Sequence, residues 1–267
     1  MSAKFFLVLI FLTSLRVHAF QLGDHEAITR QAVAEFLTCF SQYRGRLNAE
    51  PLVNADLEED QNLLVKELFF SHYYSPRQNL NMFRGTSLDR IHNLAGDLQQ
   101  CRADAPKISL AGIDQLGHAI HHLQDMNVPA HVVPVRHSFW DGFESYRFDG
   151  DISSGWSCSK MAALADTDVQ SILTRTAEQT LVAVHDYRVH VINDSDRSIQ
   201  SVDGGKFWVE GHGFGQYGPL KFGELQFRDA RGPHSIKESY FTSFKQQQMK
   251  RAVRATLRGL VWALRPQ

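Results

Sequence analysis

The segment that decides the fold spans residues 110–141 and reads LAGIDQLGHAIHHLQDMNVPAHVVPVRHSFWD. Apolar residues recur in it with the spacing of one helix face, at Ile113, Leu116, Ile120 and Leu123. Pro129 follows, and a proline pushes the residue before it out of helical conformation. The sequence therefore predicts an amphipathic helix over residues 113–126 that ends ahead of Pro129.

The same periodicity recurs in three further segments, residues 25–43, 161–188 and 243–264. Alternating strand patterns are scarce, and the glycine-rich residues 202–232 favour an irregular excursion over the surface. No internal repeat, low-complexity tract or linker divides the chain. We therefore expect an all-α fold, a single mainly helical domain.

The first residues carry the features of a secretory signal peptide. Lys4 precedes an apolar run over residues 5–15, and Val17-His18-Ala19 is a small-residue cleavage site. The run is too short to cross a bilayer as a stable helix. We expect a signal peptide at residues 1–19, a mature domain at 20–267 beginning with Phe20, and a secreted or periplasmic location. The alternative is an uncleaved anchor or a buried N-terminal helix.

Composition restricts the possible partners and metal ligands. A hydrophobic fraction of 43% supports a substantial core, and a net charge of −1 gives no electrostatic reason to expect a polyanionic partner. The three cysteines, Cys39, Cys101 and Cys158, predict one disulfide and one odd thiol after export, with the pairing left open. The spacing C-x2-C is absent, which leaves imidazoles and carboxylates as metal ligands.

Histidines and aspartates cluster on and after the predicted helix. His121 and Asp125 are separated by four residues and so share a helix face, and His131 and the His137/Asp141 pair follow. Imidazoles mixed with aspartates suit zinc with an open coordination position. One ion cannot use all these ligands, and Asp125 can bridge two. Such a centre activates water and binds phosphate oxygens, so hydrolysis of a phosphoester is the natural reaction.

Ordered motifs around these ligands resemble the trinuclear zinc hydrolases, which include bacterial zinc-dependent phospholipase C and the S1/P1 nucleases. The motifs are Gly23-Asp24-His25-Glu26-Ala27-Ile28-Thr29, Glu59-Asp60, Ser71-His72-Tyr73-Tyr74-Ser75-Pro76, His121 to His131 with Pro129-Ala130-His131, and His137-Ser138-Phe139-Trp140-Asp141. They cover the first half of the mature chain in the same order. The resemblance implies a helical fold of the phospholipase C/P1 nuclease type.

The resemblance also implies three zinc ions per chain. One would be bound by Asp60, His72, His121 and Asp125, a second by His131, His137 and Asp141, and a third by His25, Asp125 and the backbone amino and carbonyl groups of Phe20. It further implies a water or hydroxide nucleophile between the ions that share Asp125. Asp60 would accept its proton or orient it.

Some assignments stay open at the level of sequence. Glu144 competes with Asp141 for the last position at the second ion. Asp56, Glu58 and Glu59 are interpreted as a solvated face, although one of them could replace Asp60. His118 and His122 flank the ligand helix, where roles in supporting the ligands or in packing are expected. The aromatic residues near His72 and Asp141 are interpreted as core or as an apolar substrate rim, and they are Phe69, Phe70, Tyr73, Tyr74, Phe139 and Trp140.

Two departures from the family pattern bear on function. Phe20 stands where the family usually has tryptophan, and only residues 132–136 separate His131 from His137, without the glycine-asparagine segment of the fungal and plant nucleases. We therefore expect a phospholipase C that cleaves phospholipids to diacylglycerol and a phosphorylated head group, with peripheral membrane contact and no protein partner. The alternatives are a nuclease acting on single-stranded nucleic acid and a non-catalytic zinc-binding protein.

Overall fold

Helices make up most of the computed structural model, which describes residues 22–61, 72–77, 86–91, 94, 110–136, 141–165 and 168–265. The predicted signal peptide and Phe20 lie outside the described residues. The helices are α1 (Leu22–Cys39), η1 (Ser41–Tyr43), α2 (Ala49–Gln61), α5 (Leu110–Asp125), α6 (Pro129–Val132), α7 (Gly142–Ser145), α8 (Cys158–Ala162), α9 (Val169–Asp186), η2 (Gly204–Lys206) and α10 (Glu238–Leu264).

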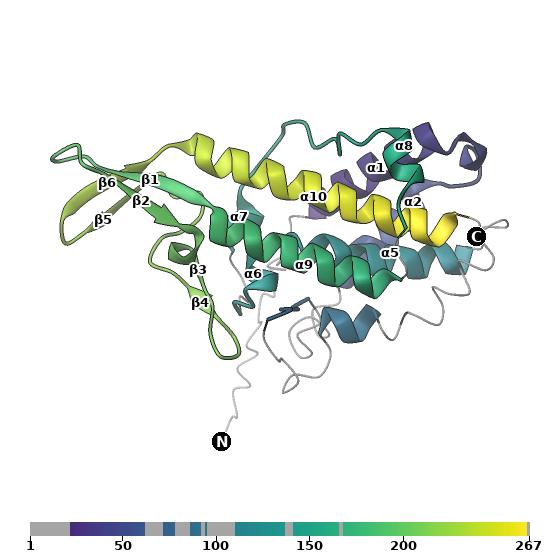
Figure 1. Ribbon diagram of the computed structural model, residues 1–267, viewed down its shortest axis with the longest axis horizontal. Helices are drawn as coiled ribbons and strands as arrows, with labels where there is room; N and C mark the ends of the chain where they lie inside the picture. Colours follow the sequence, from purple (N-terminus) through teal and green to yellow (C-terminus); the bar gives the residue numbers. More distant parts are fainter. Residues whose placement is uncertain are drawn as a thin grey trace, which may run out of the picture.

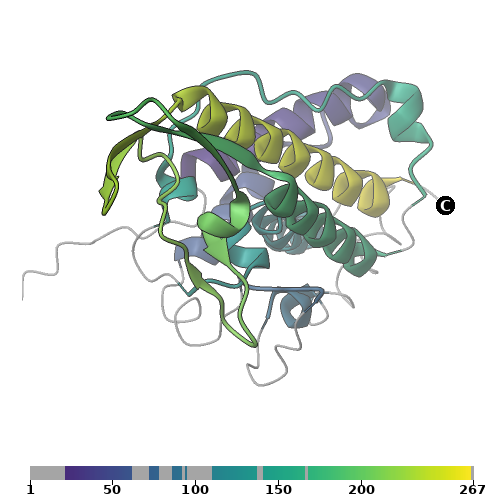
Figure 2. The same cartoon turned by 60° about the vertical axis from the view of Figure 1, so that its left-hand side comes forward.

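The long helix α10 runs along the helical layer and joins its parts. It packs against α1, α5 and α9, and α9 lies beside it in both views of the molecule (Figures 1 and 2). Buried apolar residues on α10, such as Val253, Leu257 and Leu260, belong to one core with Ile28 of α1 and Leu123 of α5. Burial of this apolar surface is the main term that stabilises the helical layer.

Helices α2 and α5 approach each other very closely at Gly117. A Cβ atom at this position would lie 2.6 Å from the Cβ of Ala55 and 2.7 Å from the carbonyl oxygen of Leu52. Only glycine permits this approach, because any other side chain would collide with α2. The contact brings the acidic face of α2 next to the histidine-bearing face of α5.

The chain is mainly helical, as expected, but it is not all-α, because it also contains strands. The strands are β1 (Arg188–Asn193), β2 (Ile199–Asp203), β3 (Trp208–Val209), β4 (Gln216–Tyr217), β5 (Gln226–Asp229) and β6 (Gly232–Ile236). An antiparallel sheet in the order β2-β1-β6-β5 lies at one end of the helical layer, and β3 and β4 form a separate hairpin (Figure 1).

Residues 202–232, expected to be irregular, therefore contain β3, β4 and β5 and the ends of β2 and β6. The strands are short, and their side chains are largely exposed, so the sequence lacks the alternation that marks a half-buried strand. In β1, by contrast, Val189 and Val191 alternate with exposed neighbours. The prediction was wrong here because two-residue and four-residue strands leave too little pattern to detect.

The predicted helix over residues 161–188 is two helices, α8 and α9. The side chain of Asp168 caps α9 by accepting a hydrogen bond from the backbone N–H of Ser171 at 2.6 Å. The predictions over 113–126 and 243–264 correspond to α5 and α10, both longer than expected. Among the helices in the described part of the chain, none is both long and apolar enough to cross a membrane.

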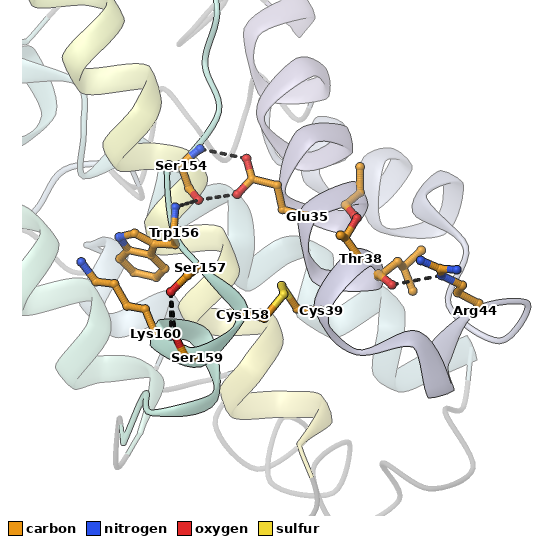
Figure 3. Close-up of a disulfide and its surroundings, with 12 residues drawn as sticks. Glu35, Thr38, Cys39, Arg44, Ser154, Trp156, Ser157, Cys158, Ser159 and Lys160 are labelled. Atoms are coloured by element: carbon orange, nitrogen blue, oxygen red, sulfur yellow. Dashed lines mark hydrogen bonds between the residues drawn. A yellow bond between two sulfur atoms is a disulfide. The ribbon is translucent and has the colours of Figure 1, made fainter.

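One disulfide links Cys39, at the end of α1, to Cys158, at the start of α8 (Figure 3). The sequence left this pairing open, and Cys101 lies outside the described residues. Next to the disulfide, the carboxylate of Glu35 accepts a hydrogen bond from the backbone N–H of Ser154 at 2.8 Å. The cross-link therefore fixes the segment before α8 against the first helix.

Replacing both cysteines by serine is expected to lower the free energy of unfolding by about 3–5 kcal/mol, because the closed loop of 119 residues restricts the unfolded chain. Urea unfolding of the Cys39→Ser/Cys158→Ser variant and of the oxidised wild type, at equal zinc concentration, measures the difference. In a reducing buffer the two curves should coincide. An unchanged midpoint under oxidising conditions would show that the disulfide does not contribute.

Candidate metal centre

Four imidazoles surround the carboxylate of Asp125, at the C-terminal end of α5. Its Oδ2 lies 2.6 Å from Nδ1 of His72, 3.3 Å from Nε2 of His121 and 3.4 Å from Nδ1 of His131. Its Oδ1 lies 3.6 Å from Nε2 of His25. All five side chains are buried. Residues far apart in the sequence thus converge on the aspartate that the sequence predicted as a bridging ligand.

Asp60 of α2 lies beside two of these imidazoles, those of His25 and His121. Its carboxylate oxygens are 3.8 Å from Nε2 of His25 and 3.9 Å from Nε2 of His121. Two groups of potential ligand atoms result, one from His25, Asp60 and His121 and one from His72, His121 and Asp125, each with its atoms within 4.8 Å of one another. The shared His121 places the two groups side by side.

The charge of the cluster fits divalent cations. Six carboxylates are buried among the described residues, and they belong to Asp56, Glu59, Asp60, Asp125, Asp141 and Glu144. Lys245 is the only buried lysine or arginine in the same part of the chain. Buried negative charge is costly unless positive charge compensates it, and metal ions are one means of compensation. Nitrogen and oxygen ligands in this mixture suit zinc.

The pKa values reflect the same negative field. Burial lowers the pKa of His121, yet the carboxylates of Asp125 and Asp60 outweigh burial and set that pKa well above its ordinary value. Burial also lowers the pKa of His131, but Asp125 and Glu144 together raise that pKa to about 9. The pocket thus favours positive charge at the positions where metal ions would lie.

The carboxylate of Glu144 contacts His131. Its Oε1 lies 3.0 Å from Nε2 of His131. Asp141 instead caps α7, where its Oδ1 accepts a hydrogen bond from the backbone N–H of Glu144 at 2.9 Å, and its Oδ2 accepts one from the hydroxyl of Tyr217 at 3.0 Å. The spacing argument for Asp141 pairs it with His137, which lies outside the described residues. Asp141 itself has an extended backbone and precedes α7, which begins at Gly142.

Zinc content should therefore respond to Glu144 and not to Asp141. We expect Glu144→Gln to bind one zinc ion fewer per chain, because an amide oxygen carries no negative charge. Asp141→Asn should keep the wild-type zinc content, since asparagine caps a helix as well as aspartate does. Elemental analysis of both variants after dialysis makes the comparison. The opposite pattern would restore Asp141 as the ligand.

The acids around Asp60 do not form the solvated face that was expected. Asp56 and Glu59 are buried, and only Glu58 is exposed. Asp56 contacts His121 and His25 from the side of their Nδ1 atoms. This burial could not be predicted, because four acids within five residues resemble an ordinary helix surface.

Glu59 binds a second set of side chains behind the centre. Its Oε1 lies 3.0 Å from Nδ1 of His118 and 2.5 Å from the guanidinium of Arg90. Its Oε2 lies 3.7 Å from Nε2 of His122, whose pKa burial lowers to about 3, so this imidazole is neutral. His118 and His122 thus lie beside the ligand cluster, as the sequence predicted. Phe20 and His137, the remaining predicted ligands, lie outside the described residues.

A cavity of about 840 Å³ lies beside Asp141 and Tyr217, and its lining residues do not include the imidazoles around Asp125. Its lining also includes Trp208 and the cationic side chains of Arg147 and Lys221. The hairpin of β3 and β4 borders this region and is anchored to the ligand-bearing segment by a hydrogen bond of 2.8 Å from the N–H of Gly215 to the carbonyl of Pro134.

Comparison with known proteins gives no family assignment. The chain matches no protein-family model, and it matches no curated protein. Function is therefore inferred from the chemistry of the centre.

Proposed function

We propose that this protein is a zinc-dependent phosphodiester hydrolase of the phospholipase C type. The observation that carries the proposal is the convergence of four buried imidazoles on Asp125, with Asp60 beside them. A carboxylate with imidazoles facing both of its oxygens can bridge two ions. Zinc bound there would lower the pKa of a water molecule toward neutrality and neutralise the oxygens of a phosphate ester.

The residues of the chain have distinct roles in this proposal. His72, His121 and Asp125 would hold one ion, and His131 and Glu144 a second. His25 would hold the third with Asp125 and the terminal residue Phe20. Asp60, whose oxygens lie slightly farther from the imidazoles, would orient the attacking water and accept its proton.

The cavity beside Asp141 offers space for a substrate near the proposed centre. Asp141 accepts a hydrogen bond from the backbone N–H of Glu144, the proposed ligand of the second ion. The lining combines aromatic rings with two cations, Arg147 and Lys221, and two acids, Asp141 and Glu224. Its apolar walls suit the acyl chains of a phospholipid, and this favours a lipid over a nucleic acid as substrate.

The disulfide supports the proposed export of the protein. A bond between Cys39 and Cys158 requires an oxidising compartment to form and persist. Together with the signal peptide predicted at residues 1–19, it supports a secreted or periplasmic enzyme that meets its lipid substrate at a membrane surface.

One assay series tests the proposed function. The zinc-loaded mature protein is incubated with phosphatidylcholine micelles, with denatured DNA and with a chromogenic phosphodiester. We expect release of diacylglycerol and a phosphorylated head group, loss of this activity with a chelator, and its recovery on addition of zinc. Cleavage of DNA alone would favour the nuclease, and no hydrolysis by a zinc-loaded protein would favour the non-catalytic binder.

A further inference from the structure

A buried network behind the centre joins Asp56 and Gln124 to two of the imidazoles. Oδ1 of Asp56 lies 3.2 Å from Nδ1 of His121 and 3.3 Å from Nδ1 of His25. Oε1 of Gln124 lies 2.7 Å from the same nitrogen of His25. Thr29 completes the network by donating from its hydroxyl to Oδ2 of Asp56 at 2.5 Å.

The hydrogen bonds fix the orientation of the Gln124 amide. Thr29 donates its hydroxyl proton to Asp56, because an ionised carboxylate can only accept a hydrogen bond. The oxygen of Thr29 must therefore accept from Gln124, whose Nε2 lies 2.7 Å away. This places Oε1 of Gln124 against His25, where an amide oxygen can only accept. Nδ1 of His25 consequently carries a proton.

The same reasoning applies to His121, whose Nδ1 faces only an acceptor on this side, the carboxylate of Asp56. In a neutral imidazole with a proton on Nδ1, the lone pair is on Nε2. The rings of His25 and His121 are stacked, with centroids 4.4 Å apart and planes inclined by 17°. Both Nε2 atoms therefore point the same way, toward Asp60 and Asp125.

We propose that Asp56 and Gln124 are positioning residues that hold His25 and His121 in the tautomer required to bind metal through Nε2. The inference rests on the proposed function and deepens it. Asp56 is then not a ligand itself, because it lies on the Nδ1 side of both rings, opposite the nitrogens that face Asp125. The carboxylate of Asp56 contacts two imidazoles that would bind different ions. Its loss should therefore lower the zinc affinity at both ion positions.

The test replaces Asp56 by asparagine. Asparagine keeps the size, but its amide cannot accept from Thr29, Gln124 and both imidazoles at once. Loss of a carboxylate that orients a metal-binding histidine typically weakens metal affinity 10- to 100-fold. We expect Asp56→Asn to raise the zinc dissociation constant by about this factor at two of the ion positions, measured by competition with a chromogenic chelator. Glu50→Gln, a change at an exposed acid of the same helix, should bind zinc like the wild type.

A second readout separates positioning from a general loss of structure. In the zinc-loaded wild type, two-bond proton–nitrogen NMR should show the proton on Nδ1 of His25 and of His121, and in Asp56→Asn the signal of His121 should change. Gln124→Met keeps the shape of the side chain but lacks the acceptor, so it should lower the affinity only for the ion that His25 binds. If Asp56→Asn does not fold, this variant provides the test. Wild-type zinc affinity in both variants, or a proton on Nε2 of either ring in the wild type, would overturn the inference. A wild-type protein without zinc binding would instead overturn the proposed function.

Discussion

Asp125→Asn is expected to lose at least about 1,000-fold in kcat/KM and to bind fewer zinc ions than the wild type. Asp125 is the only described carboxylate that faces four imidazoles, so its charge acts on every ion position to which they contribute. A metal ion supplies several kcal/mol of transition-state stabilisation, and each 1.36 kcal/mol is a factor of ten in rate. Phosphodiester hydrolysis and elemental analysis measure the two effects.

A matched control lies on another helix. Asp186 is exposed at the end of α9, so Asp186→Asn makes the same chemical change away from the cluster. It should keep the wild-type rate and zinc content. Full activity in Asp125→Asn would show that Asp125 is not a bridging ligand, whether or not the control variant is active.

Removal of zinc should destabilise the protein strongly. With zinc at about 1,000 times its dissociation constant, binding contributes about 4 kcal/mol to the free energy of unfolding. Chelation removes this contribution and leaves the buried carboxylates without divalent cations. We expect a lower melting temperature in the presence of chelator, fully restored by zinc. Equal melting temperatures with and without zinc would contradict a metal centre in the core.

The stabilisation of the fold by zinc should depend on pH in a defined direction. In the metal-free protein the pKa of His131 is raised from 6.5 to about 9, so its proton stabilises the fold below about pH 6.5 and this contribution is lost as the pH rises through 9. Zinc competes with that proton and binds more tightly at higher pH. The difference in melting temperature between the zinc-loaded and metal-free protein should therefore widen from pH 6 to pH 9.

Much of the centre could be predicted from sequence because its ligands lie on regular elements or in ordered motifs. The helical spacing of His121 and Asp125 places both on one face of α5, and the motifs around His25 and His72 bring two further imidazoles to Asp125. Such side chains are recognisable because helix geometry links their spacing to their direction.

The missed features depend on tertiary contacts that no local pattern encodes. Asp56 and Glu59 are buried because Gly117 lets α5 approach α2, and a charged residue in a helix does not reveal which face is covered. Glu144 appeared in the sequence only as the competitor of Asp141, because spacing does not show that Asp141 has an extended backbone and caps α7. The sheet was missed because its strands are short and mostly exposed.

The most direct test of the central claim is anomalous diffraction at the zinc absorption edge from crystals of the zinc-loaded protein. We predict three peaks, with two of them about 2.0–2.2 Å from oxygens of Asp125 and within the same distance of imidazole nitrogens from His25, His72 and His121. A map without peaks at Asp125, or one in which these side chains point away from a common ion, would contradict the account.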